Sequence, residues 1–122
     1  MLRTTGLDGK RNLLVGSLPI EQRKLVEVAR ALASSPRLLM MDEPMSGLNS
    51  VETRAFIDLV EKINKSGVTV LVVEHVRKAI VTLCSRIIVL HLGHKLAEGS
   101  PQAILADREV VQAYLGSDYA NS

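Results

Sequence analysis

The sequence predicts an α/β protein in which parallel strands lie against helices. Two short apolar runs, residues 38–41 and 68–73, each follow a stretch with helical periodicity and are bounded by turn residues. Alternating helices and strands are typical of a parallel sheet covered by helices. Polar residues come directly after both runs, at the carboxyl ends of the predicted strands, where ligands of such sheets bind. A functional site is therefore expected at that edge of the sheet.

The composition narrows the function classes. Apolar residues make up 47% of the 122 residues but aromatic residues only 2%, so the core has to be built from aliphatic side chains. A net charge of +2 without a dense basic stripe argues against nucleic-acid binding. The single cysteine, Cys84, excludes an internal disulfide and a multi-cysteine metal site. No apolar run approaches the ~20 residues that cross a bilayer, and we expect a soluble protein that a partner can hold at a membrane.

The first helix is predicted from about residue 19 to residue 34. Apolar side chains recur on one of its faces at the helical period, at Leu25, Val28, Ala29 and Leu32. Pro36 ends the helix, because a proline disfavours the helical conformation of the residue before it. The apolar run 38–41 stops at an Asp-Glu-Pro sequence, and we interpret it as a strand buried on both faces.

The second helix is predicted over residues 50–66. Asn49 is a suitable N-cap, and Glu52 three residues later completes the pattern of a capping box. Gly67 suits the position just after the helix, where a left-handed residue is common. Residues 68–73 form the second predicted strand and are again expected to be buried.

Shorter elements follow the second strand. A helix is predicted over residues 76–84. Two strands, 86–92 and 95–98, then form a hairpin with Gly93-His94 as its two-residue turn.

Two helices are predicted at the end of the chain from their boundary residues. Ser100 and Pro101 fit the N-cap and the first position of a short helix. Asp107 caps the last helix, which is expected to end at Gly116.

Two adjacent carboxylates end the first strand. Asp42 and Glu43 point to opposite sides, because side chains alternate along a strand, so they serve different purposes. One can hold a hydrated Mg²⁺, which prefers one or two carboxylates plus phosphate oxygens, and the other can orient or deprotonate a water molecule. The alternative interpretation is a solvated strand end that leads into a turn. Glu74 and His75 follow the second strand and are expected at the same edge.

Three motifs occur in order around these residues. Residues 38–49 read Leu-Leu-Met-Met-Asp-Glu-Pro-Met-Ser-Gly-Leu-Asn, residues 18–32 contain a Leu-Pro-Ile-Glu-Gln segment that opens a helix, and residues 73–75 read Val-Glu-His. In sequence and spacing they resemble the acidic strand end and its loop, the signature helix and the switch histidine of ATP-binding-cassette (ABC) ATPases. The resemblance covers nearly the whole chain and corresponds to the carboxyl-terminal half of that family.

The resemblance implies a three-layer, P-loop NTPase-like parallel sheet with flanking helices. Residues 1–17 would be the end of the helical subdomain, and residues 18–122 the C-terminal part of the ABC ATPase domain. No G-x-x-x-x-G-K-[ST] phosphate-binding loop occurs in the sequence, and we expect a chain truncated at its N-terminus. It would use ATP and Mg²⁺ only with that loop supplied from elsewhere, and we expect it to be inactive alone.

The resemblance also implies roles for individual residues. Asp42 would bind Mg²⁺, Glu43 would act as general base toward the attacking water, and His75 would contact the γ-phosphate. Signature residues would face nucleotide held by the other half of a dimer, and these are Leu18, Pro19, Ile20, Glu21 and Gln22. The loop that crosses the dimer interface would consist of Ser46, Gly47, Leu48 and Asn49. The structural alternatives are helix-capping roles for His75 and Asn49.

The signature differs from the Leu-Ser-Gly-Gly-Gln that is usual in the family. Pro19 has no N–H to offer a phosphate, Ile20 is branched where a close backbone approach is wanted, and Glu21 brings a negative charge. The structural alternative is that proline in the first turn and an acidic residue near the N-terminus are good choices for starting a helix.

The segments 97–101 and 107–116 are similar to ATPase subunits of branched-chain amino-acid importers. The implied function is an ATP-hydrolysing subunit that energises such import. Its partners would be a second ATPase subunit and transmembrane permease subunits, on the cytoplasmic face of the plasma membrane. The alternative is a non-catalytic or degenerate module that pairs with a complete ATPase subunit. A phosphoacceptor domain built on Asp42 is a third hypothesis, which Glu74 supports poorly as a second acidic ligand.

Overall fold

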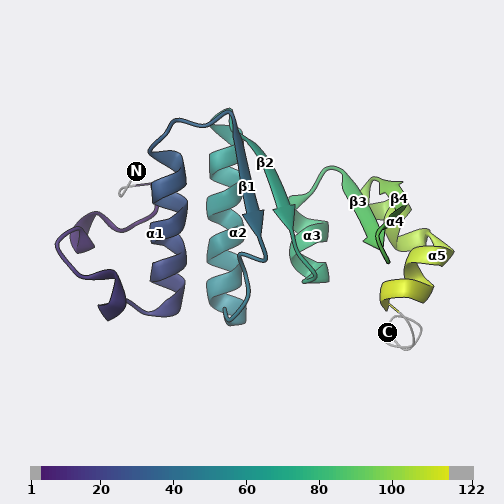
Figure 1. The fold of residues 1–122 in the computed structure, drawn as a ribbon, viewed down its shortest axis with the longest axis horizontal. Helices are drawn as coiled ribbons and strands as arrows, with labels where there is room; N and C mark the ends of the chain where they lie inside the picture. The colour runs from purple at the N-terminus through teal and green to yellow at the C-terminus, as the bar shows by residue number, and fades with distance from the viewer. Residues whose placement is uncertain (1–3, 116–122) are drawn as a thin grey trace. The chain divides into compact units, whose positions relative to one another are not determined.

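The chain divides into two compact units, Met1–Ala79 and Ile80–Ser122, and the computed structural model describes residues 4–115 (Figure 1). Helix α3 (Arg77–Leu83) contains the boundary between the units. The helix end predicted at Gly116 lies outside the described residues, as do the first three residues of the predicted segment 1–17. The division at residues 17 and 18 stays a prediction.

The first unit has the order of helices and strands that the sequence predicts. Two short 3-10 turns, Asp8–Lys10 and Val15–Ser17, precede α1 (Ile20–Leu32), β1 (Leu38–Asp42), α2 (Ser50–Lys65) and β2 (Thr69–Val73). The two strands pair in parallel, from Leu38 opposite Thr69 to Asp42 opposite Val73. This parallel pair, with a helix connecting its strands, confirms the predicted α/β fold class and brings both carboxyl ends to one edge.

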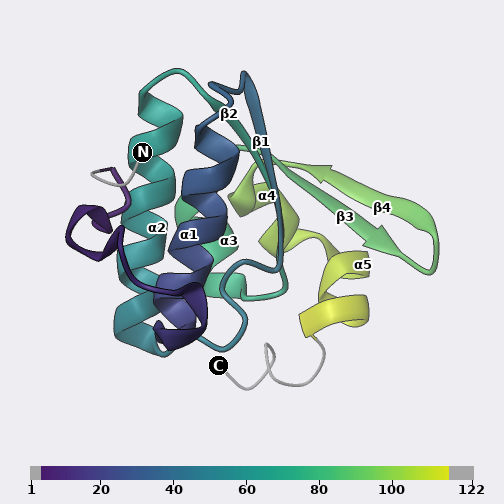
Figure 2. The same cartoon turned by 60° about the vertical axis from the view of Figure 1, so that its left-hand side comes forward.

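The core of the first unit lies between its helices and one face of the strand pair. Figures 1 and 2 show α1 and α2 side by side, with α2 next to the strands. The helices bury one apolar stripe each, made of Val28, Ala29 and Leu32 on α1 and of Phe56, Ile57, Val60 and Ile63 on α2. Leu39 contributes from β1. Of the predicted face of α1, Leu25 alone is only half-buried.

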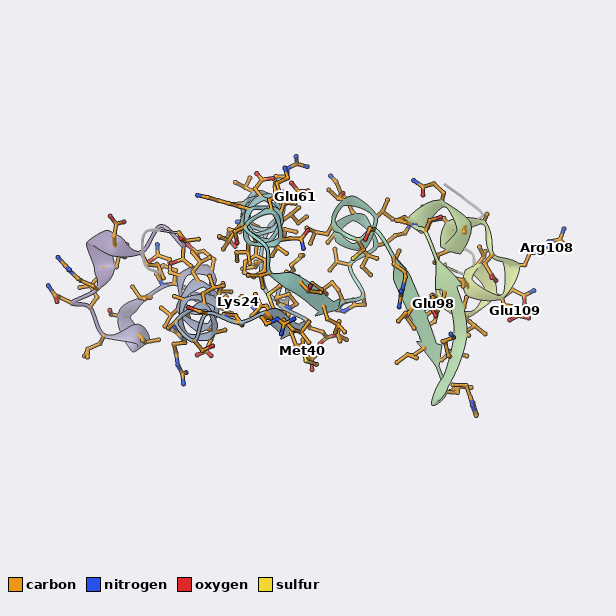
Figure 3. The ribbon with its side chains drawn as sticks, turned by 90° about the horizontal axis from the view of Figure 1, so that it is seen from above. Lys24, Met40, Glu61, Glu98, Arg108 and Glu109 are labelled. Atoms are coloured by element: carbon orange, nitrogen blue, oxygen red, sulfur yellow. The ribbon has the colours of Figure 1, made fainter. Side chains whose placement is uncertain are left out.

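The other face of the β1–β2 pair is exposed. Alternate apolar side chains of both strands lie on it with 44% to 66% of their surface accessible, namely Leu38, Met40, Leu71 and Val73. Figure 3 shows Met40 on the side of the strands opposite to α2. The prediction that both strands are buried on both faces is therefore wrong for this chain. The described helices of the first unit cover one face only, and contiguous exposed apolar surface is rare on monomeric proteins.

The second unit is an antiparallel hairpin with short helices packed against it. Its elements are β3 (Ile87–His91), β4 (His94–Gly99), α4 (Pro101–Ala106), α5 (Arg108–Val110) and a π-helical turn (Val111–Leu115). The core of this unit contains Val89, Ile104 and Val110. No helix among residues 4–115 is long and apolar enough to cross a membrane.

Both caps predicted in the second unit are confirmed. The Ser100 side chain accepts a hydrogen bond from the Ala103 N–H, and Pro101 is the first residue of α4. The Asp107 carboxylate accepts hydrogen bonds from the Glu109 and Val110 N–H groups at the start of α5.

The hairpin turn lies one residue earlier than predicted. His91 pairs with His94, so the two-residue loop is Leu92-Gly93 rather than Gly93-His94. The φ angles of Leu92 and Gly93 are 49° and 80°. Positive φ at both central residues is the type I′ turn, whose twist matches that of the flanking strands. The glycine therefore occupies the second turn position, and the pairing of the two histidines sets the register.

Asn49 forms the predicted capping box at the start of α2. Its side-chain oxygen accepts a hydrogen bond from the Glu52 N–H at 2.8 Å, and the Glu52 carboxylate accepts one from the Asn49 N–H at 3.1 Å. The structural role proposed for Asn49 from the sequence is thus present in the fold. At the other end of α2, Gly67 has a φ of 109°, in the region that glycine favours.

Replacing Asn49 with alanine should lower the free energy of unfolding by about 1 kcal/mol, because the Glu52 N–H loses its acceptor. Urea denaturation followed by circular dichroism measures this loss. Asn49→Asp keeps an acceptor oxygen at the same place and is the matched control, with a clearly smaller loss. Equal losses in the two variants would contradict the capping role.

Candidate functional site

The candidate site lies where β1 and β2 end. The Glu43 N–H donates a hydrogen bond of 2.7 Å to the Val73 carbonyl, which extends the parallel pairing one residue beyond β1. Glu43 has a φ of 47°, a left-handed conformation that costs a non-glycine residue roughly 1–2 kcal/mol. The backbone therefore bends at Glu43, which lies in the turn after β1 and not in the strand itself.

His75 meets Glu43 at this edge. The His75 Nδ1 lies 3.0 Å from the Glu43 Oε1, although 32 residues separate them along the chain. An ionised carboxylate can only accept a hydrogen bond, so the contact requires a proton on Nδ1. The side chains are 72% and 53% exposed, and an exposed pair contributes at most about 1 kcal/mol to stability. The contact thus orients two accessible groups more than it stabilises the fold.

Asp42 stands at the same edge as the last residue of β1. It is opposite Val73 in the parallel register and is exposed. No group of three or more His, Cys, Asp or Glu side chains among the described residues could hold a metal ion by itself. A lone carboxylate still fits Mg²⁺, which commonly keeps several waters and takes one or two carboxylates with phosphate oxygens. The donor set therefore suits a Mg²⁺ that arrives with a phosphate ligand.

Glu74 is a buried residue of this edge. Its side chain is only 1% exposed. The Glu74 Oε2 accepts a hydrogen bond from the Met45 N–H, and the Oε1 accepts one from the His75 N–H, both at 3.2 Å. Alternation along β2 could have revealed it, because Val73 faces outward and the next residue then faces inward.

The predicted signature and interface loop lie against each other within the first unit. Gly47 has a φ of 80°, and a Cβ at this position would lie 3.3 Å from the Ile20 Cδ1. The Ser46 and Leu48 N–H groups donate to the Glu43 and Met45 carbonyls, so the loop is a continuous run of turns from the end of β1. The acidic edge, the loop and the start of α1 are therefore neighbours.

The signature residues differ in exposure. Leu18 is buried at 5% exposure, Pro19 and Ile20 are exposed, and Glu21 is half-buried in the first turn of α1. The side-chain oxygen of Gln22 is buried and has no hydrogen-bond partner among the described residues. A buried acceptor without a donor is costly.

Arg23 is exposed on α1, and its guanidinium binds the backbone of the segment before the helix. Its Nε donates to the Leu18 carbonyl at 2.8 Å and its Nη2 to the Gly16 carbonyl at 3.4 Å. The guanidinium satisfies carbonyls of the segment that leads into α1, where regular structure provides no donors. It thereby fixes the position of the signature residues. Arg30, by contrast, forms an exposed ion pair with Glu27, as a solvated face requires.

Two groups of the second unit have shifted pKa values. A hydrogen bond from Lys95, together with the nearby charge of Arg86, holds the pKa of Glu98 below its usual value. Partial burial raises the pKa of the Cys84 thiol, which makes it a poor nucleophile.

Comparison with known proteins finds a matching family model and similar transport proteins. A family model described as a branched-chain amino acid ATP-binding cassette transporter matches residues 94–120. The chain is 39% identical over 106 residues to the high-affinity branched-chain amino acid transport ATP-binding protein BraF of Pseudomonas aeruginosa, covering 86% of this chain and 42% of BraF. It is 34% identical over 109 residues to the lipopolysaccharide export system ATP-binding protein LptB of Escherichia coli, covering 89% and 45%.

A solved ATP-binding cassette structure has a similar fold over the matched region. The ADP conformation of MJ1267, an ATP-binding cassette of an ABC transporter, superposes with a TM-score of 0.86 at 29% identity over 94% of this chain and 47% of that one. The chain thus spans less than half the length of the relatives it matches.

Replacing Gly47 with alanine should lower the free energy of unfolding by about 1–2 kcal/mol, because an L-residue is strained in the left-handed conformation. Urea denaturation measures the change. Gly9→Ala is the matched control, since a Cβ there meets no atom within 4 Å and its φ is not in the left-handed region. If both variants are equally stable, the turn described for the interface loop is incorrect.

Proposed function

We infer that this chain, which corresponds to the carboxyl-terminal half of ABC transporter ATPases, supplies the part of an ATP-hydrolysing site that handles Mg²⁺ and water. The observation that carries the proposal is the 3.0 Å contact between Glu43 and His75 at the carboxyl edge of two parallel strands. Ligands of such sheets bind at this edge, and both side chains are accessible there.

Each residue of the edge has a distinct role in the proposal. Asp42 would hold Mg²⁺, and the ion would neutralise charge on the phosphate oxygens. Glu43 accepts a proton from the attacking water as general base. His75 faces the terminal phosphate and reports its presence through the contact with Glu43. The exposure of all three side chains supports these roles, since a substrate can reach each of them.

The signature residues and the interface loop serve a second nucleotide in this proposal. Residues 18–22 and 46–49 would face nucleotide held by the other subunit of a dimer. The exposure of Ile20, Ser46 and Gly47 supports this proposal, because a partner subunit can reach these positions. The Ile20 side chain lies close to Gly47, since a Cβ at that position would be 3.3 Å from the Ile20 Cδ1, so the two segments would meet the partner as neighbours.

We propose branched-chain amino-acid import as the process that this subunit energises. The family model over residues 94–120 and the identity to BraF support import, whereas the identity to LptB favours export of a lipid as the competing process. The partners in either case would be a second ATPase subunit and membrane-spanning permease subunits, which would hold the chain at the cytoplasmic face of the membrane.

Two observations favour a non-catalytic module as a second candidate. The 122 residues contain no G-x-x-x-x-G-K-[ST] sequence, whose backbone N–H groups and lysine would hold the phosphates. Pro19 offers no N–H at the start of α1, and Glu21 places a negative charge in its first turn. In this alternative the chain completes the interface of a full ATPase subunit without turning over ATP itself.

The proposal is tested by supplying the other half of the domain. We expect this chain, fused behind the amino-terminal half of BraF, to hydrolyse Mg²⁺-ATP, and Glu43→Gln to lower kcat by about 10²–10⁴-fold, because the general base is lost. A coupled phosphate-release assay measures the rate. Glu27→Gln, which removes an exposed charge from α1, is the matched control and should be silent. Folded fusions without activity would support the non-catalytic module.

The isolated chain should not bind Mg²⁺-ATP at micromolar concentrations, because most phosphate contacts of the family come from the loop that its sequence lacks. Titration calorimetry of the 122-residue chain measures this directly. Micromolar affinity that is lost in Asp42→Asn would show that the carboxylate edge holds the nucleotide without that loop, contrary to the expectation.

A further inference from the structure

The buried carboxylate of Glu74 requires a physical explanation. Glutamate is almost never fully buried unless it is paired, and burying a charged group is costly unless hydrogen bonds replace its hydration. The Glu74 side chain is 1% exposed. Both of its oxygens accept backbone N–H groups, from Met45 and from His75. Two such bonds to an ionised acceptor are stronger than neutral ones, and they provide the compensation that burial demands.

These two bonds connect segments that lie far apart in the sequence. Met45 belongs to the turn that follows β1 and is itself buried at 3% exposure. His75 follows Glu74 directly, just beyond β2. One carboxylate therefore fixes the backbone of the turn and the backbone of the histidine at the same time. Any movement of the turn away from β2 would break the bond to Met45.

The turn has a strained residue that something must hold. Glu43 adopts its left-handed conformation between the Glu43 N–H bond to the Val73 carbonyl and the Ser46 N–H bond to the Glu43 carbonyl. Such a conformation persists only where the surroundings over-determine it. The Glu74 bond to Met45 lies two residues further on and closes the turn against β2. It adds the constraint that the first two bonds do not provide.

We propose that Glu74 is a positioning residue, whose buried carboxylate holds the turn at Glu43 against the end of β2 and so keeps the Glu43 carboxylate in contact with the His75 ring. This deepens the proposed function and rests on it for the roles of Glu43 and His75. The contact between those two side chains is too exposed to maintain itself, since pairs of this kind contribute little. Glu74 supplies the rigid support from the buried side of the same edge.

The histidine ring provides a spectroscopic readout of this arrangement. Its Nδ1 lies 3.0 Å from the Glu43 Oε1 and 3.7 Å from the Glu74 Oε1. The hydrogen bonds of a histidine ring decide which of its two nitrogens carries the proton. Contact with an ionised Glu43 places that proton on the Nδ1 of His75. The tautomer of neutral His75 therefore reports on the carboxylates that face Nδ1, of which Glu43 is the nearer.

The test compares Glu74→Gln with wild type in the 122-residue chain, without nucleotide. Glutamine has the same shape but one acceptor oxygen fewer, so one backbone N–H loses its partner. We expect amide hydrogen exchange at Met45 or His75 to become about tenfold faster or more, in line with the loss of a charge-assisted bond. Long-range ¹H–¹⁵N spectra should show His75 moving from the Nδ1–H to the Nε2–H tautomer. Unchanged exchange and an unchanged tautomer would overturn the proposal.

Three controls separate positioning from a general loss of stability. Glu27→Gln removes the same charge from an exposed site and should alter neither readout. Exchange at Val60, in the core of the first unit, should stay as in wild type when Glu74→Gln acts locally. Glu43→Gln should change the His75 tautomer but leave the amides of Met45 and His75 protected, because Glu74 holds them independently. Loss of that protection in Glu43→Gln would show that Glu43 is needed to hold these amides, contrary to the proposal that Glu74 holds them.

A measurement on the wild-type chain decides the matter if Glu74→Gln fails to fold. A scalar coupling across the hydrogen bond should link the Met45 backbone nitrogen with the Glu74 carboxylate carbon, and its absence from the folded chain would overturn the proposal. None of these readouts uses ATP. Their failure would leave the proposed ATPase role standing, and an inactive fusion protein would leave the positioning role standing.

Discussion

The candidate site depends on the parallel pairing of β1 with β2. This pairing runs in register to Asp42 and Val73 and continues through the hydrogen bond between the Glu43 N–H and the Val73 carbonyl. Because both strands run in the same direction, residues 32 positions apart leave the sheet at one edge. A shift in register by a single residue would turn every side chain of β1 to the other face and would separate the acidic residues from His75.

Residues at this edge divide into exposed groups and the buried groups that hold them. Glu43 and His75 present accessible atoms, and their contact is weak by itself. Glu74 and Met45 lie behind them, nearly inaccessible, and join the turn to the strand end. Arg23, although exposed, also fixes backbone at the start of α1, where it donates to carbonyls of the preceding segment. Side chains poised for chemistry thus stand on backbone that buried polar contacts keep in place.

One face of the β1–β2 pair is apolar and exposed, and it consists of Leu38, Met40, Leu71 and Val73. The alignments cover less than half of each relative. Exposed apolar surface of this kind is unusual on a soluble monomer, and strands rich in aliphatic residues belong to sheets covered on both sides. The exposed apolar face and the partial coverage of the relatives are therefore consistent with each other.

The sequence alone determined the order of helices and strands and the caps at Asn49, Ser100 and Asp107, because local periodicity and capping chemistry act within a few residues. It also predicted that Glu43 and His75 lie at one edge, because each follows a strand of an expected parallel sheet. Tertiary structure decided the rest. The exposed sheet face depends on which surfaces the remainder of the chain covers, and the hairpin turn on the pairing of His91 with His94. The structural role of Glu74 depends on a turn 29 residues away. Only the fold supplies such partners, since no local pattern encodes which distant N–H group will meet a buried carboxylate.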